Sequence, residues 1–176
     1  MNLNSLPGNV RQYGYVVPDI DQAMAAWLGL GVGPWYVIRK QSQSGLYRGE
    51  TCEVTLSIAF ANTGDLQIEL IQQLDDTPSV YTEFLAAGGA EVHQLAWWTD
   101  DFEASLKAAE ATGWPVVWSG GGENGSTRYV YLELPDGAPA AVAELMELTP
   151  AIAGLGRLVR EAANGWDGTD PIRPLG

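Results

Sequence analysis

One segment of this chain occurs twice, and the repeat limits the folds that the chain can adopt. Residues 11–21 have the sequence RQYGYVVPDID, and residues 93–103 have the sequence HQLAWWTDDFE. The aspartates at positions 101 and 19 align at an offset of 101 − 19 = 82 residues, which places Gln94 on Gln12. Each copy predicts a strand with alternating faces, followed by a helix that an aspartate caps. We therefore expect two copies of one folding unit.

Both copies continue in the same order, with a strand, a helix and three further strands. Helical apolar stripes and runs of β-forming residues indicate these elements. The first unit is predicted to have strands at residues 9–17, 35–38, 50–60 and 66–73 and a helix from residue 21 to residue 28 or 30. The second unit is predicted to have strands at residues 92–99, 115–118, 127–134 and 141–148 and a helix at residues 101–112. The polar segment 41–48 is expected to be a loop or a hairpin connection.

The two units form modules that are expected to share one core. The predicted domain covers residues 1–148, with a loose entry segment at residues 1–8 and modules at about 9–74 and 91–148. A short helical pattern around residues 80–87 connects the modules. Residues 149–176 are predicted to form a C-terminal helix, at 149–164, and a turn-rich tail. Because this helix has an apolar stripe, it must cover the sheet of its own subunit or that of a partner.

Charge and cysteine content narrow the classes of function. The formal net charge of −13 argues against nucleic acid and anionic membranes as partners. An acidic surface explains the charge, and a pocket for a cationic ligand is an alternative. The single cysteine, Cys52, excludes an internal disulfide. No apolar run is long enough to span a membrane and no signal-peptide pattern is present, so a cytoplasmic protein is expected.

Four polar residues occupy matching places in the predicted strands, and these residues are Gln12, Glu69, Gln94 and Glu144. If the modules pair edge to edge, two amides and two carboxyl groups share one face. Carboxylate and amide oxygens suit a hard divalent ion such as Mg²⁺, Mn²⁺ or Ca²⁺. Alternatively, one glutamate is a general base and the other a proton-retaining acid, while the glutamines orient a substrate. A third interpretation is that these polar groups only satisfy one another.

The only histidine, His93, precedes Gln94 directly. In a regular strand Gln94 faces inward and His93 outward, because neighbouring side chains alternate. A bulge would exchange them and make His93 a candidate ligand for Zn²⁺, Ni²⁺ or Co²⁺.

Aromatic residues cluster around the same elements. A subset is expected to wall an apolar pocket above the polar group, as is usual for small-molecule sites. The candidate substrate-binding residues, besides the two glutamines, are Trp35, Trp98, Tyr129 and Arg128. For Arg128 a role at the surface is the favoured interpretation, and most of the aromatic residues are expected to belong to the core.

These segments resemble the vicinal oxygen chelate superfamily, which includes glyoxalase I, methylmalonyl-CoA epimerase, extradiol dioxygenases and bleomycin-resistance proteins. The matching segments are residues 12–21, 31–35, 66–71, 93–101 and 142–145. The resemblance implies an α+β fold in which two tandem βαβββ modules form a curved, half-open β-barrel with flanking helices. It also implies a metal held by Gln12, Glu69, Gln94 and Glu144. The chain departs from the glutamine, Glu, His, Glu set of glyoxalase I, because Gln94 stands at the third place and His93 lies one residue earlier.

The resemblance implies three alternative functions. The first is a glyoxalase-like isomerase, epimerase or lyase that acts on a small, largely apolar carbonyl, hydroxyl or epoxide compound. In it Glu69 and Glu144 move protons, with no cofactor or with one divalent metal ion. The second is a non-catalytic protein of the same fold that sequesters a drug or metabolite. The third is a non-catalytic, dimer-forming scaffold, and for each function a homodimer is expected.

Overall fold

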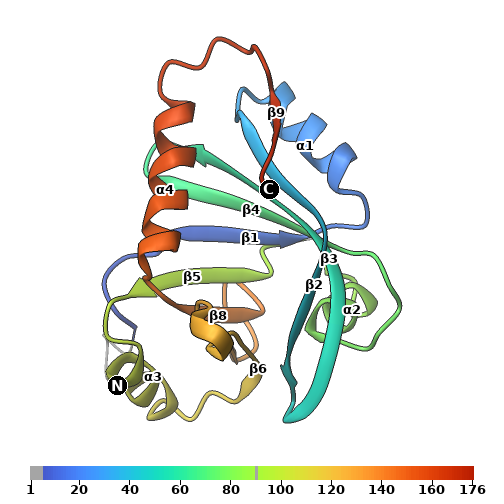
Figure 1. Cartoon of the computed structure of the whole chain (residues 1–176). Helices are drawn as coiled ribbons and strands as arrows, with labels where there is room; N and C mark the ends of the chain where they lie inside the picture. Colours follow the sequence, from blue (N-terminus) through green and yellow to red (C-terminus); the bar gives the residue numbers. More distant parts are fainter. Residues whose placement is uncertain (1–5, 90) are drawn as a thin grey trace.

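The computed structural model describes residues 6–89 and 91–176, so most of the predicted entry segment lies outside it. Its main feature is a mixed nine-stranded sheet with the strand order β3-β4-β1-β5-β8-β7-β6-β2-β9 (Figure 1). The strands are β1 (Gln12–Val16), β2 (Trp35–Tyr47), β3 (Glu50–Thr63), β4 (Leu66–Gln73), β5 (Gln94–Thr99), β6 (Val116–Gly120), β7 (Tyr129–Glu133), β8 (Val142–Glu147) and β9 (Ile172–Pro174). The helices are α1 (Ile20–Gly29), α2 (Val80–Ala86), α3 (Phe102–Glu110) and α4 (Pro150–Ala163), and a short 3₁₀ turn, η1 (Glu123–Gly125), joins β6 to β7.

The predicted α+β fold with tandem βαβββ modules is confirmed. The first module runs β1-α1-β2-β3-β4 and the second runs β5-α3-β6-β7-β8. The modules pair within the one chain, because β1 is antiparallel to β5 and the end of β2 is antiparallel to β6. Since β2 also pairs with β3, the sheet curves into a ring of eight strands.

Strand β2 is longer than predicted: residues 41–47, expected to belong to a loop or a hairpin connection, are part of the strand, and the hairpin turn is confined to Arg48 and Gly49. Residues 41–47 pair with residues 50–56 of β3, and the last three also pair with β6. These residues are mostly exposed or half-buried, so their polar sequence does not oppose a strand. Pairing with β3 along the segment, and with β6 at its end, decides the structure here, because it satisfies backbone polar groups.

Matching aspartates start the module helices, as the repeat predicts. The side chain of Asp19 accepts a hydrogen bond from Gln22 N at 3.0 Å, and Asp101 accepts one from Ala104 N at 3.1 Å. Each cap satisfies a backbone donor that the first helical turn leaves free. Helix α1 buries Ile20 and Met24 in a cluster with Trp35, on the outer face of the sheet.

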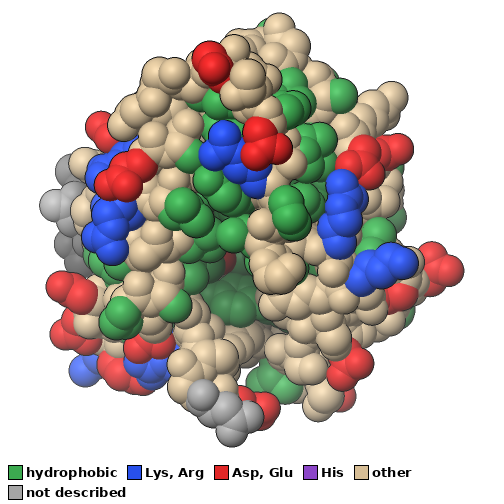
Figure 2. Space-filling model, turned by 45° about the horizontal axis from the view of Figure 1, so that its top comes forward, with side chains coloured by type: hydrophobic (Ala, Val, Ile, Leu, Met, Phe, Trp, Pro, Cys, Tyr) green, Lys and Arg blue, Asp and Glu red, His purple; other side chains and the backbone are tan. Residues whose placement is uncertain are grey.

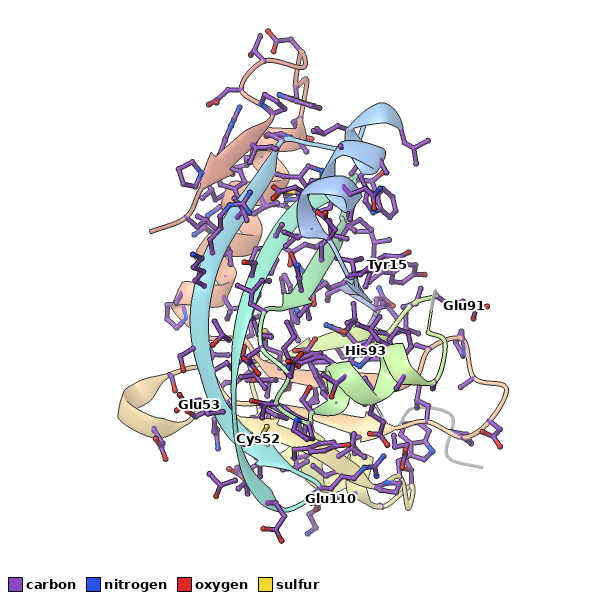
Figure 3. All side chains as sticks on the ribbon, turned by 90° about the vertical axis from the view of Figure 1, so that its right-hand side faces the viewer. Tyr15, Cys52, Glu53, Glu91, His93 and Glu110 are labelled. Carbon is purple, nitrogen blue, oxygen red and sulfur yellow. The ribbon has the colours of Figure 1, made fainter. Side chains whose placement is uncertain are left out.

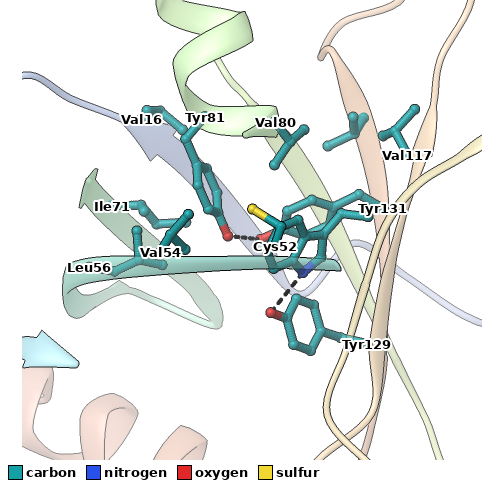
Figure 4. Close-up of a cluster of buried hydrophobic side chains, with 12 residues drawn as sticks. Val16, Cys52, Val54, Leu56, Ile71, Val80, Tyr81, Val117, Tyr129 and Tyr131 are labelled. Atoms are coloured by element: carbon teal, nitrogen blue, oxygen red, sulfur yellow. Dashed lines mark hydrogen bonds between the residues drawn. The ribbon is translucent and has the colours of Figure 1, made fainter. Parts of the chain in front are cut away.

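The interior of the barrel is filled mainly by aromatic and aliphatic side chains (Figure 4). Tyr81 of α2 lies 3.3 Å, oxygen to oxygen, from Tyr131 of β7, and Trp118 Nε1 donates to the Tyr129 hydroxyl at 2.8 Å. Phe84 of α2 packs against the same cluster. Helix α2 therefore closes one end of the barrel, and the polar atoms of these four tyrosine and tryptophan side chains have partners, as buried ones usually require.

The C-terminal segment covers the barrel of its own chain. Val159 and Leu155 of α4 pack on Tyr36 and Phe60, so the helix lies across the first module, as Figure 1 shows. The tail then adds β9, which pairs in parallel with the start of β2. Sequence analysis missed this strand because it has only three residues and includes a proline. Among the described residues, none of the helices is both long and apolar enough to cross a membrane.

Candidate functional site

The predicted polar quartet lies on one face of the sheet, as the strand register shows. Across the seam between the modules, Gly14 is opposite both Glu69 and Gln94. Ala96 is likewise opposite both Gln12 and Glu144. Residues opposite one another in adjacent strands point to the same face. All four side chains are buried, and the most exposed of them, Glu69, retains 7% of its accessible surface.

Three of the buried side chains form a hydrogen-bonded chain. Gln94 Nε2 donates to Glu69 Oε2 at 2.8 Å, and Gln94 Oε1 contacts Nδ1 of His93. Because an amide oxygen can only accept, Nδ1 carries the proton and Nε2 of His93 is the free acceptor. Of the two alternatives for His93, the outward one does not hold, since its side chain is fully buried, and Gln94 is buried as well. His93 precedes the first residue of β5, so strand alternation does not fix its direction.

Figure 3 shows His93 inside the molecule beside α2. Its ring lies 4.9 Å from that of Phe84 and 5.7 Å from that of Tyr131, measured between centroids. Burial lowers the pKa of His93 to about 4, so the ring is neutral at physiological pH. His93 thus orients Gln94 and does not supply a charge.

The two carboxyl groups influence each other's protonation. Burial raises the pKa of Glu69 to about 8, and the hydrogen bond from Gln94 partly opposes this rise. Burial raises the pKa of Glu144 well above its ordinary value, and the charge of Glu69 raises it further. Oε2 of Glu144 has no partner among the described residues. The pair therefore holds at least one proton at neutral pH, and Glu69 is the carboxyl group that ionises first.

Buried tyrosines border this pair and were not among the predicted site residues. Burial raises the pKa of Tyr81 and of Tyr131, and the charges of Glu69 and Glu144 raise both pKa values further. Both hydroxyls stay protonated and can donate hydrogen bonds. Tyr131 is opposite Glu144 in the sheet, so strand pairing could have indicated it. The position of Tyr81 depends on how α2 packs, which the sequence does not show.

Gly14 is a second residue that sequence analysis missed. A Cβ atom at this position would lie 2.2 Å from Cδ of Gln94. The absent side chain of Gly14 therefore leaves the space through which Gln94 reaches Glu69.

Gln12 shares the face but does not bond either carboxyl group. Its Nε2 donates to Oε1 of Gln67 at 2.7 Å, and its Oε1 has no partner among the described residues. The four predicted metal ligands consequently do not converge on one point, because the Gln94 amide also lies between Glu69 and His93. Within residues 6–89 and 91–176, no group of three or more His, Cys, Asp or Glu side chains is placed to hold a metal ion. The four predicted ligands, in the arrangement seen here, do not form a metal site. Metal binding by this protein therefore stays a prediction.

The other predicted substrate-binding residues lie in different surroundings. Trp35 is fully buried on the outer face, where its Nε1 donates to Val32 O, so the structure places it away from the carboxyl pair. Tyr129 lies in the barrel interior. Arg128 forms ion pairs with Glu147 and Glu103 at the surface, which agrees with the favoured surface role. Trp98 lies at the rim of the barrel, against Gly156 of α4.

The surface is hollowed over the barrel. Figure 2 shows a depression near the centre of that face, and hydrophobic side chains form most of its floor. Apolar walls of this kind, with a small number of polar groups, are usual for small-molecule sites.

Comparisons with known proteins match this architecture. A family model described as "Glyoxalase/Bleomycin resistance protein/Dioxygenase superfamily" matches residues 11–131. The chain is similar in structure to methylmalonyl-CoA epimerase from Mycobacterium tuberculosis, with 24% identity, 88% of this chain and 97% of that chain covered, and a TM-score of 0.56. A hypothetical protein from Bacillus halodurans C-125 has 18% identity, covers 80% and 94% of the two chains, and gives a TM-score of 0.55.

A third similar structure is a single-residue variant of Streptomyces coelicolor methylmalonyl-CoA epimerase in complex with 2-nitronate-propionyl-CoA. It has 17% identity, covers 81% of this chain and 95% of that chain, and gives a TM-score of 0.56. A comparison with curated proteins found no match. At these identities the structural likeness establishes the fold alone.

Proposed function

Because this chain belongs to the glyoxalase/bleomycin resistance protein/dioxygenase superfamily, we propose that it is a glyoxalase-like isomerase or epimerase. Its substrate would be a small, largely apolar compound with a carbon acid next to a carbonyl group. Glu69 and Glu144 are the acid–base pair. The observation that carries this proposal is the burial of two carboxyl groups on one face, where their pKa values are raised and only one has an amide donor.

Glu69 and Glu144 have different surroundings, and these surroundings determine which of them is the base and which is the acid. The Gln94 amide stabilises the carboxylate form of Glu69, so Glu69 is the base that removes a proton from the carbon. The C–H electron pair moves into an enolate. Glu144 retains its proton because of burial and the charge of Glu69, and it returns a proton to the carbon. Tyr131, whose hydroxyl stays protonated, is available to donate a hydrogen bond to the enolate oxygen.

Deuterium exchange tests this proposal with a panel of compounds, so the substrate itself need not be identified first. Chiral compounds with a carbonyl next to the stereocentre are incubated with the protein in D₂O, and deuterium at that carbon is followed by NMR. We expect Glu69→Gln and Glu144→Gln each to slow exchange by roughly 10²–10⁴-fold. The matched control is Glu53→Gln, since Figure 3 shows Glu53 on the outside of the molecule. Unchanged exchange in both site variants would remove the proposed roles.

The hydrophobic floor of the hollow also favours a second function, which is binding of a small molecule without turnover. Titration of the tryptophan fluorescence with apolar carbonyl compounds tests it. Saturable quenching without any deuterium exchange supports this second function and contradicts the first.

A further inference from the structure

A pocket of about 470 Å³ lies between α4 and the adjoining ends of β1, β4 and β5. It lies partly on the C-terminal helix, which is outside the part of the chain that matches the superfamily model. Three of the chain's nine basic residues line it, namely Arg11, Arg157 and Arg160. Basic side chains are visible at the left of Figure 2, on the side where Figure 1 places α4.

The arginines of this pocket differ in their partners from three of the four other arginines, and the fourth, Arg173, has one ion pair, with Asp170 at 3.6 Å. Arg39, Arg48 and Arg128 each form an ion pair with a carboxylate at 3.0 Å or less. Among the described residues, by contrast, Arg11 and Arg157 form no ion pair. Arg160 has only a 3.9 Å contact with Asp65, whose side chain is 98% exposed. The pocket lining thus has three arginines and one carboxylate, Asp65, and in a chain of net charge −13 this local excess of positive charge is suited to an anion.

Buried polar atoms in the pocket wall lack partners. The indole N–H of Trp98 is buried and has no acceptor among the described residues. This group can only donate, so it requires an acceptor such as a carboxylate or phosphate oxygen. The Arg11 guanidinium lies 4.9 Å from the centroid of the Trp98 ring, which adds a cation beside that donor. The wall also contains Asn62, 5% exposed, whose Oδ1 lacks a partner among the described residues and would accept from a ligand hydroxyl.

The pocket borders the face that holds the carboxyl pair. Gln67 lines the pocket, and its Oε1 accepts the hydrogen bond from Gln12. Gln12 lies on the face of Glu144, with Ala96 between them in the sheet. The pocket is therefore adjacent to the face of Glu144, and the buried Gln12–Gln67 bond lies between the two.

We propose that this pocket binds the carboxylate or phosphate group of a small organic anion. That the same molecule is the substrate rests on the proposed function, whereas binding of the anion does not. Arg157 and Arg11 provide charge-assisted hydrogen bonds, and the Trp98 indole provides a third donor. The substrate class is consequently an anion with an apolar body, held at its charged end by a part of the chain beyond the two modules.

Calorimetric titration with benzoate, phenyl phosphate and benzamide tests the proposal. We expect saturable binding of at least one of the two anions and at least tenfold weaker binding of benzamide, which matches benzoate in shape but is neutral. Tighter binding of benzoate identifies a carboxylate site, and tighter binding of phenyl phosphate identifies a phosphate site. Equal affinity for benzamide and for the tighter-binding anion, or no binding of either anion at millimolar concentration, overturns the proposal.

Variants locate the site and separate it from the proposed catalysis. Arg157→Gln should weaken anion binding at least tenfold, and because Arg157 is exposed this variant should unfold at the parent temperature. Arg39→Gln, which removes an arginine from a surface ion pair, is the matched control and should bind as the parent does. Glu69→Gln should still bind the anion, so a failed catalytic hypothesis would leave this test intact. Equal binding by the Arg157→Gln and Arg39→Gln variants contradicts the assignment.

Discussion

The two modules have the same order of elements but place their polar residues in different hydrogen bonds. Across the seam between β1 and β5, Gly14 is opposite Gln94 and Ala96 is opposite Gln12. Gln94 crosses Gly14 and bonds Glu69, the residue on the far side of Gly14. The matching path for Gln12 crosses Ala96 toward Glu144, and no such bond forms between these described residues.

One methyl group explains this difference. A side-chain carbon at Gly14 would overlap Gln94, and Ala96 has such a carbon at the equivalent place. Gln12 therefore bonds Gln67 of its own module, and Glu144 keeps an oxygen without a partner among the described residues. A duplicated backbone thus yields two unlike carboxyl groups, which is what proton transfer between an acid and a base requires.

The difference between the two carboxyl groups can be tested through protein stability. The largest expected effect is a change of the free energy of unfolding with pH. A carboxyl group whose pKa is raised by folding stabilises the protein fully below the unfolded pKa, about 4.3, and loses that contribution as the pH rises through the folded pKa. With a folded pKa of about 8 for Glu69, stability should fall toward pH 8, by up to about 1.4 kcal/mol per pH unit for each carboxyl group. The folded pKa of His93 is lowered to about 4, so its contribution to stability rises with pH between about 4 and about 6.5. Between pH 6.5 and pH 8 this contribution is nearly constant, and the change in stability reports on the carboxyl groups.

Urea unfolding at pH 6.5 and pH 8 measures this fall. Glu69→Gln should reduce the fall in the free energy of unfolding between the two pH values, because the variant lacks one of the two buried carboxyl groups. Glu53→Gln, a change at an exposed glutamate, should show the same fall as the parent. A parent protein that is equally stable at both pH values contradicts the buried ionisation of the pair.

The next effect comes from exchanging the residues at the seam. Gly14→Ala should cost about 1–3 kcal/mol of stability, because the new methyl group overlaps a buried side chain. It should also displace Gln94 from Glu69 and slow deuterium exchange. Ala96→Gly, the symmetric change, should cost about 1 kcal/mol and leave the Gln94–Glu69 bond in place. If thermal unfolding ranks the two variants the other way round, Gly14 does not set the difference between the modules.

Removing the amides gives a smaller but more specific contrast. Gln94→Leu leaves the Glu69 carboxyl group and the His93 Nδ1–H without their partner, so we expect a loss of about 2 kcal/mol. Gln12→Leu removes only the bond to Gln67, and the expected loss is about 1 kcal/mol. The two variants should also differ in the pKa of Glu69. The hydrogen bond from Gln94 lowers this pKa, so Gln94→Leu should raise it further. A titration of the variants by carbon NMR of the glutamate carboxyl groups checks this shift, and equal shifts for the two leucine variants would argue against the assigned partners.

The sequence predicted the barrel and the shared face because both depend on local alternation and on the repeat. It did not predict which amide reaches which carboxyl group, since that depends on a missing side chain 80 residues away along the chain (94 − 14 = 80). It left open whether His93 faces inward, because alternation does not determine the direction of a residue that precedes the strand. The arginine-lined pocket was also missed, because it exists only once α4 lies against Trp98.

The two modules also differ in that α4 covers the first of them. The smallest expected effect on stability comes from substitutions in this helix. Two glycines of this helix, Gly154 and Gly156, allow a matched comparison. A Cβ atom at Gly154 would meet nothing within 4 Å, so Gly154→Ala should stabilise the protein by about 0.5–1 kcal/mol through helix propensity. At Gly156 the new atom would lie 3.0 Å from the Trp98 ring, so the same gain is offset by displacement of the ring. Thermal unfolding should therefore rank Gly154→Ala above Gly156→Ala, and only Gly156→Ala should also weaken benzoate binding, because it shifts the tryptophan that lines the anion pocket.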